Sequence, residues 1–120
     1  MLKALETPAN LPFSRELWRY DPSSYIGKVR EPIEILIGKK DIQVDWVIDG
    51  KFLESSLSGH KDASFDYPDN ANHVLKHEEL PRDELTAEYV TSHYNSPNSK
   101  LDSESVNLIT NWLEDHIYAQ

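Results

Sequence analysis

Two short apolar runs dominate the hydrophobic pattern of the chain, PIEILIG at 32–38 and ASFDY at 63–67. The first run is rich in isoleucine, lies between a proline and a glycine, and is apolar at both odd and even positions. That pattern predicts a strand buried on both faces, as in a parallel sheet beneath helices. The second run predicts another short strand of the same sheet.

A helix is expected between these strands, over DGKFLESSLSG at 49–59, because Phe52, Leu53 and Leu57 share one helical face. Gly59 suits the C′ position that ends a helix. The order strand, helix, strand predicts a βαβ unit with parallel strands. The expected fold class is therefore α/β, with a small parallel sheet and flanking helices.

Two further helices are expected after the sheet. PRDELTAEYV at 81–90 has a proline suited to position N1 and acidic residues in its first turn. Residues 102–117 predict a longer amphipathic helix that Asp102 caps. Its apolar face is expected to contain Val106, Ile109, Trp112, Leu113 and Ile117.

The N-terminal part has a different pattern, because residues 1–32 hold four of the seven prolines. Long helices are therefore not expected there. SRELWRY at 14–20 predicts one short helix with Ser14 as its cap. Residues 1–120 together are expected to form one small domain of common size.

Composition and charge narrow the class of protein. A hydrophobic content of 38% is enough for a core, and a net charge of −9 argues against a surface for nucleic acids or anionic membranes. The chain has no cysteine, which excludes disulfides, thiol nucleophiles and cysteine-based zinc sites. No apolar run approaches the ~20 residues of a membrane span, and MLKALETPANLPF lacks the apolar stretch of a signal peptide. A cytoplasmic protein is expected.

The candidate chemistry lies in the loops that follow the two strands. The first loop begins GKKD and contains Asp41, and the second, turn-rich loop contains His73. The carboxyl ends of parallel strands share one edge of a sheet, where open α/β sheets bind their ligands. Asp41 and His73 are therefore expected to meet. A carboxylate in this position fixes the tautomer of the imidazole and stabilises its protonated form.

The segments EILIGKKDIQVDW and YPDNANHVLKHE, with the closing amphipathic helix, resemble the last third of an α/β-hydrolase. Those enzymes carry their triad in the order serine, acid, histidine. The family's acid follows a late strand in a G-x-x-D context that Gly38 and Asp41 match. Its histidine follows the last strand, as Asn72 and His73 do. The resemblance implies a partial α/β-hydrolase fold with Asp41 as triad acid and His73 as triad histidine, and residues 1–31 as the end of a lid.

The family's nucleophile is missing from this sequence. The motif G-x-S-x-G requires two glycines four residues apart, and the glycines at 27, 38, 50 and 59 include no such pair. Ser58, in SLSGH, follows an expected helix instead of a strand. The chain therefore retains two triad members and is expected to be inactive alone.

A metal or other cofactor is not expected. His73 and His77 form an H-x-x-x-H pair, which on a helix would present two imidazoles to zinc. However, Val74 stands where the glutamate of H-E-x-x-H would be.

Two functions remain open. The first is a C-terminal fragment of a serine hydrolase of the carboxylic ester or acyl class, whose missing N-terminal half supplies the serine. The alternative is a non-enzymatic α/β interaction module. In either case an unpaired edge of the strand at 32–38 predicts a partner, either the missing half or a second copy in a homodimer. The homodimer is expected to bury Ile33, Ile35 and Ile37.

Overall fold

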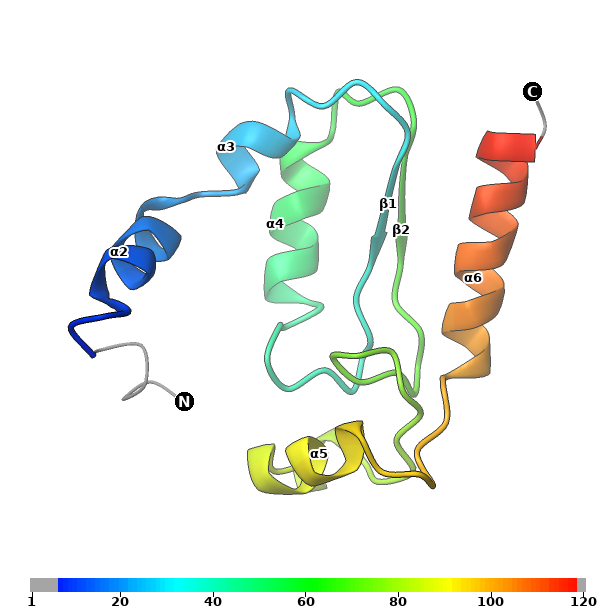
Figure 1. The fold of residues 1–120 in the computed structure, drawn as a ribbon. Coiled ribbons are helices and arrows are strands. Elements are labelled where there is room, and N and C mark those ends of the chain that lie inside the picture. Colours follow the sequence, from blue (N-terminus) through cyan, green and yellow to red (C-terminus); the bar gives the residue numbers. More distant parts are fainter. Residues whose placement is uncertain (1–6, 119–120) are drawn as a thin grey trace.

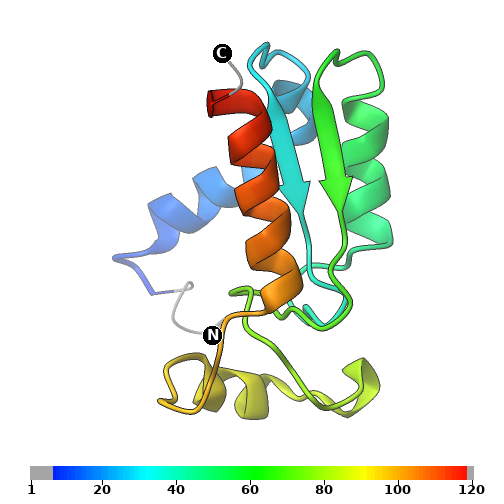
Figure 2. The same ribbon diagram turned by 90° about the vertical axis from the view of Figure 1, so that its right-hand side faces the viewer.

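The computed structural model describes residues 7–118, and its sheet has two strands in that range (Figure 1). Strands β1 (Ile33–Leu36) and β2 (Ala63–Asp66) run parallel, with Ile33 opposite Ala63. The helix between them, α4 (Ile48–Ser56), lies on one side of the sheet, and α6 (Ser103–Leu113) lies on the other (Figures 1 and 2). The mixed α/β class and the parallel βαβ unit are thereby confirmed.

The two faces of the sheet differ in polarity, so the expectation of two apolar faces was wrong. One face of the sheet lies against α4. Tyr67, which follows β2, shows this, because its hydroxyl donates to Oε1 of Glu54 in α4 at 2.7 Å. The residues of the α6 face include Glu34, Ser64 and Asp66, and Ser64 Oγ donates to Glu34 Oε2 at 2.5 Å. The run IEILI hides this polarity, because Glu34 is its only polar letter.

Asp66 lies close enough to Glu34 on the α6 face to affect the ionisation of Glu34. Burial raises the pKa of Glu34 above 4.5, and neighbouring Asp66 raises it further, although the Ser64 hydrogen bond lowers it. The charged form is thus disfavoured in the folded protein. The stability that protonated Glu34 contributes is complete below pH 4.5, and it is lost as the pH rises through the raised pKa of Glu34 in the folded protein.

We therefore expect Glu34→Gln to stabilise the protein at neutral pH by about 1 kcal/mol or less, because the amide removes a charge that burial and the neighbouring Asp66 both disfavour. Urea unfolding at several pH values measures this. The gain over the unmodified protein should grow as the pH rises above 4.5. Glu16→Gln, at an exposed position of the N-terminal region, is the matched control. An equal gain in both variants would show that the charge of Glu34 is not the cause.

The C′ position expected for Gly59 was also wrong. Helix α4 ends at Ser56 with Leu57 as its C-cap. No glycine of the described chain has a positive φ, so Gly59 does not supply the left-handed conformation that a C′ glycine provides.

The N-terminal region forms two short helices, α2 (Leu11–Arg19) and α3 (Ser23–Ile26). The expected cap at Ser14 was wrong, because α2 begins three residues earlier, with a proline in its first turn where a missing N–H costs nothing. Ser14 Oγ instead donates to Asn10 O at 3.0 Å. Residues 1–6 of the expected lid-like segment lie outside the described residues.

The helix expected at 81–90 begins later, as α5 (Ala87–Tyr94). Thr86 caps it, since its hydroxyl accepts a hydrogen bond from Tyr89 N, whereas Pro81 has an extended ψ of 149°. A threonine that satisfies a free N–H of the first turn thus determines the start. Between the two, residues Arg82–Glu84 form a 3-10 turn.

Helix α6 has the expected cap, because Asp102 accepts from Ser105 N at 2.9 Å. It continues as a π-helical turn over Glu114–Tyr118. The expected apolar face is only partly covered, since Ile109 and Trp112 are half-buried. Three other members of that face are exposed: Val106, Leu113 and Ile117. A two-stranded sheet is too narrow to cover the whole apolar arc of this helix.

The core of the described chain is small for 120 residues. Five hydrophobic residues are buried among residues 7–118: Ile37, Leu57, Ala71, Leu85 and Val90. The accessible surface is 8829 Å², against about 6,600 Å² for a compact monomer of this mass. The radius of gyration is 16.5 Å, against about 14 Å for a compact domain of this length. The described residues thus bury few hydrophobic side chains and leave many large ones exposed.

Candidate functional site

The loops after β1 and β2 contact each other through their backbones. Lys39 N donates to Pro68 O at 2.9 Å, and Lys40 N donates to Ala71 O at 3.1 Å. Gly38 allows this contact, because a Cβ at that position would lie 2.0 Å from the carbonyl oxygen of Ala71. The close approach brings the two candidate residues to one place at the carboxyl edge of the sheet.

Asp41 is held rigidly at this edge. It is 4% exposed, and its Oδ1 accepts from Gln43 N at 2.7 Å and Val44 N at 3.0 Å. These two bonds fix the plane of the carboxylate and leave Oδ2 directed to the second loop. A buried carboxylate in this setting is well placed to orient another side chain.

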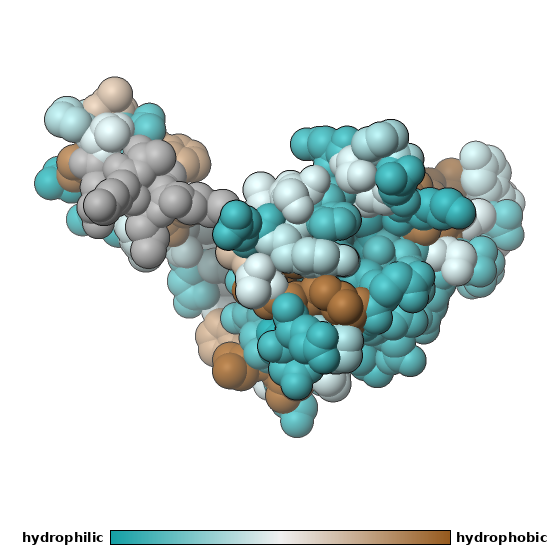
Figure 3. Space-filling view, turned by 90° about the horizontal axis from the view of Figure 1, so that it is seen from below, coloured by the Kyte–Doolittle hydropathy of each residue, from teal (hydrophilic) through white to brown (hydrophobic). Residues whose placement is uncertain are grey.

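His73 contacts this second carboxylate oxygen of Asp41. Its Nδ1 lies 2.9 Å from Asp41 Oδ2, so the contact expected from the order of the motifs is present. With a carboxylate on Nδ1, the neutral imidazole carries its proton there and keeps Nε2 free to accept one. The His73 side chain is 40% exposed. Seen from below, where the strands end, the molecular surface is mostly hydrophilic around a central hydrophobic strip (Figure 3).

Asn72 shapes the turn that presents His73. The Asn72 side chain is fully buried, and its Oδ1 accepts from Val74 N and Lys76 N, both at 3.0 Å. Its Nδ2 donates to the buried Glu78 at 2.7 Å. The sequence predicts a turn-rich loop and the pair Asn72-His73, but not this hydrogen-bond network. Its local hydrogen bonding to backbone N–H groups is the signal that was available.

Arg82 holds the loop that follows β1. Its Nε donates to Asp41 O at 3.2 Å, and its Nη2 lies 3.3 Å from Asp45 Oδ2. No sequence pattern marks this residue, because it lies 41 positions from Asp41 and bonds a backbone oxygen. The 3-10 turn Arg82–Glu84 places it there.

His77 and Asp102 form a second imidazole–carboxylate pair, with His77 Nδ1 3.1 Å from Asp102 Oδ1. Asp102 also accepts from Ser105 N and Ser105 Oγ as the cap of α6. Burial raises the pKa of Asp102, but the hydrogen bonds from Ser105 and His77 outweigh it, and the pKa lies below 3.8. The pair joins the His73 loop to α6 and has a structural role.

We expect Asp102→Ala to destabilise the protein by about 1–2 kcal/mol at neutral pH, the usual effect of losing a helix cap. Because the folded pKa is depressed, this stability is present above pH 3.8 and is lost as the pH falls through the folded pKa. Acid unfolding followed by circular dichroism should show a smaller pH dependence in the variant. Asp83→Ala, at an exposed position, should change neither the stability at neutral pH nor its dependence on pH. An equal loss of stability in Asp83→Ala would contradict the prediction.

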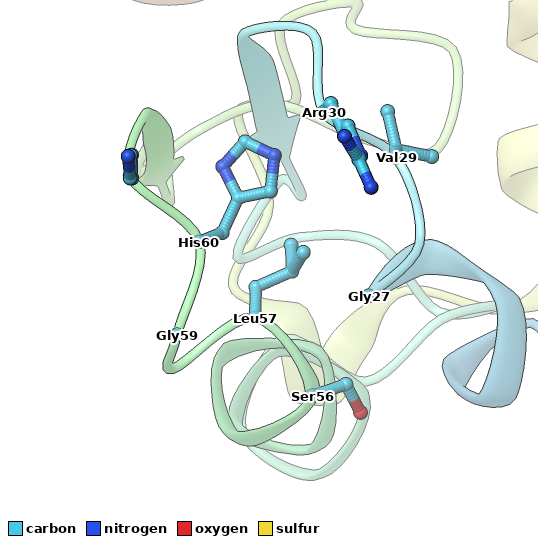
Figure 4. Close-up of a pocket in the computed structure, with 8 residues that line it drawn as sticks. Gly27, Val29, Arg30, Ser56, Leu57, Gly59 and His60 are labelled. Carbon is cyan, nitrogen blue, oxygen red and sulfur yellow. The ribbon is translucent and has the colours of Figure 1, made fainter.

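Ser58 lies far from His73 in the fold. It follows α4, which returns the chain from the carboxyl edge to the amino edge of the strands (Figure 1). A hollow of about 550 Å³ occurs at that amino edge, where the side chains of Leu57, His60 and Arg30 surround one space (Figure 4). Neither Asp41 nor His73 lines it. This hollow is therefore separate from the candidate site.

His73 and His77 do not share a helix and contact different carboxylates. Within residues 7–118, no group of three or more histidine, aspartate or glutamate side chains is arranged to hold a metal ion. No helix in that range is both long and apolar enough to cross a membrane. Comparison with protein-family models, curated proteins and solved structures finds no match.

Proposed function

We propose that this chain supplies the acid and the base, Asp41 and His73, of a serine hydrolase of the carboxylic ester or acyl class. The observation that carries the proposal is the 2.9 Å contact between His73 Nδ1 and a buried, doubly hydrogen-bonded Asp41. The serine and the oxyanion hole come from another polypeptide segment that joins the sheet beside β1. The resemblance of the two loop motifs to those of α/β-hydrolases supports the reaction class.

The chemistry assigned to the pair is proton transfer. His73 Nε2 takes the proton of the serine hydroxyl as that oxygen attacks the carbonyl carbon, and returns a proton to the leaving group. Asp41 holds the tautomer and stabilises the imidazolium, and Arg82 positions the backbone that carries Asp41. In such a triad the members act as a unit, so the pair without the serine contributes little.

The free edge of β1 supports the entry of a further strand. Ile33 N donates to Asp62 O, just before β2, and Ile37 N donates to Asp66 O, at the end of β2. Because alternate residues of a parallel strand bond to opposite neighbours, the backbone groups of Glu34 and Leu36 face the other edge. Such unpaired groups are a template for another strand. The side chains of Ile33, Ile35 and Ile37 share the face of the sheet opposite Glu34 and do not lie along this edge. A partner therefore pairs here through backbone groups.

The test is reconstitution with a polypeptide encoded directly upstream that contains G-x-S-x-G. Co-expression should give a stable complex that hydrolyses a short-chain aryl ester, and His73→Ala should reduce kcat on the order of 10⁴-fold or more. His93→Ala is the matched control for loss of an imidazole elsewhere. A complex whose rate is indifferent to His73, or an upstream region without that motif, would overturn the proposal.

The second candidate function is a non-enzymatic association module. The observation that favours it is the exposure of large hydrophobic side chains, with Val106 41% and Ile117 58% exposed. Absence of the upstream motif would favour this alternative, with the open strand edge and the outer face of α6 as binding surfaces.

A further inference from the structure

The hollow at the amino edge of the strands lies between the end of α4 and the segment that joins α3 to β1 (Figure 4). The two walls come close at Gly27, where a Cβ would lie 3.2 Å from Ser56 O. Its volume of about 550 Å³ lies within the range of sites that bind small molecules. The side chains that line it include those of Val29, Arg30, Leu57, His60 and Lys61.

This hollow is lined by cations, although the chain has a net charge of −9. Arg30 and Lys61 line it, and no described aspartate or glutamate does. Within residues 7–118 neither of the two forms an ion pair. The adjacent carboxylates have other partners. Glu31 Oε2 accepts from Arg30 N at 3.1 Å, and Asp62 Oδ1 lies 3.1 Å from His116 Nε2. The two cations are therefore available to a negatively charged ligand.

His60 is fixed in the wall of the hollow by two hydrogen bonds. Its backbone N donates to Leu57 O at 2.8 Å, and its Nδ1 accepts from Asp62 N at 3.1 Å. Because a backbone N–H only donates, the neutral imidazole carries its proton on Nε2. Nε2 is buried and has no hydrogen-bond partner within residues 7–118. The ring points into the hollow (Figure 4). The hollow thus contains a buried donor that needs an acceptor.

The remaining lining groups indicate what kind of anion fits. Leu57 is 3% exposed and, with Val29, supplies apolar groups to the lining. An inorganic ion would occupy only a small part of about 550 Å³ and would leave these apolar groups without contacts. A guanidinium such as that of Arg30 binds both oxygens of a carboxylate side by side. The lining therefore favours a carboxylate attached to an apolar body.

We propose that this hollow binds a small organic carboxylate. Its head group accepts hydrogen bonds from Arg30 and from His60 Nε2, and Lys61 adds a second positive charge. Its apolar body packs on Leu57 and Val29. Because Nε2 is shielded from solvent, water does not compete with the bond that forms there. The hollow lies at the opposite edge of the sheet from the candidate site, so this proposal does not depend on the proposed hydrolase function.

Isothermal titration calorimetry of the full chain with hexanoate tests the proposal, and hexanamide is the uncharged probe of the same shape. Hexanoate should bind with a Kd on the order of 1 mM or below. Hexanamide should bind about tenfold more weakly or worse, because it forms no ionic bond with Arg30. Inorganic phosphate should also bind more weakly, because it has no apolar body. Absence of hexanoate binding, equal binding of the amide, or tighter binding of phosphate would each overturn the proposal.

Two variants separate the contacts of the head group. Arg30→Gln removes the charge. His60→Asn keeps a side-chain oxygen that can accept from Asp62 N, but it removes the Nε2 donor. Each should weaken hexanoate binding by about tenfold or more, while circular dichroism shows both variants folded. The matched controls are Arg15→Gln, at an exposed position of α2, and His93→Asn, on α5. Both controls should bind hexanoate as the unmodified chain does.

The imidazole of His60 also gives a measurement that needs no variant. In proton–nitrogen NMR spectra of the unmodified chain, hexanoate should move the Nε2–H signal of His60 downfield, because that donor gains an acceptor. The ring signals of His93 should not change. A His60 signal that hexanoate leaves in place, or variants that bind as tightly as their controls, would contradict the assignment of the ligand to this hollow.

Discussion

The isolated chain is expected to hydrolyse a short-chain aryl ester no faster than its His73→Ala variant. His73 is oriented by Asp41 at 2.9 Å, but no described serine donates to it, and Ser58 belongs to the opposite edge of the sheet. In serine hydrolases, loss of the nucleophile from a catalytic triad lowers kcat by about six orders of magnitude. A free imidazole alone gives only slow background hydrolysis.

The measurement compares the initial rates of the unmodified chain, His73→Ala and His93→Ala at equal concentration. His93 is a matched control, because it is a half-buried histidine on α5 whose Nδ1 lies 2.7 Å from a backbone oxygen, that of Tyr89. All three rates should agree within about twofold, as expected for residual activity unrelated to a triad. A rate that depends on His73 alone would show that an unrecognised nucleophile exists in this chain, and Ser58→Ala would be the first variant to examine.

The contact at the centre of the site could be predicted from the sequence because it depends on topology. Two short strands joined by a helix must run parallel when the connection crosses over the sheet. The residues that follow them, Asp41 and His73, then leave the same edge. The order of the elements was therefore enough, even though the ends of α4, both ends of β1 and the end of β2 differ from the expected ones by one to three residues.

The surroundings of the site could not be predicted, because they depend on contacts between distant segments. Arg82 reaches a backbone oxygen 41 positions away, and Asn72 and Glu78 meet only after the loop has turned. The polar α6 face arises from the register that places Glu34 beside Ser64. Periodicity within one segment carries no information about which residue of the next strand stands opposite.

The start of α5 shows a different reason for an error. Pro81 and Thr86 are both typical residues at a helix N-terminus, and the sequence alone does not rank them. The turn at Arg82–Glu84 lies before the helix, and it places Arg82 where its Nε donates to Asp41 O. The contact between Arg82 and Asp41 thus occurs together with the later start of α5.

Gly38→Ala is expected to have the largest effect on stability of any single methyl group added to the chain. The new Cβ would lie 2.0 Å from Ala71 O and 2.5 Å from Ala71 C. These are backbone atoms of the second loop, so the conflict cannot be relieved by rotating a side chain. We expect a loss of about 3 kcal/mol or more, which is a large fraction of the 5–15 kcal/mol that stabilises a typical domain.

Gly59→Ala is the matched control for this change. No atom lies within 4 Å of the added Cβ, and the residue has no positive φ, so the methyl group should change stability by about 0.5 kcal/mol or less. Both variants add one methyl group at a position outside the helices and strands. Urea unfolding followed by tryptophan fluorescence compares their stabilities directly.

The position of His73 gives a second, local measurement on Gly38→Ala. The alanine pushes Ala71 away from the first loop, and Ala71 precedes Asn72 and His73, so the imidazole should move away from Asp41. In proton NMR spectra, the downfield Nδ1–H signal of His73 should be present in the unmodified chain and in Gly59→Ala, but lost in Gly38→Ala under conditions where α6 remains folded. An unchanged signal with unchanged stability would show that the close approach of Gly38 to Ala71 does not hold the two loops together.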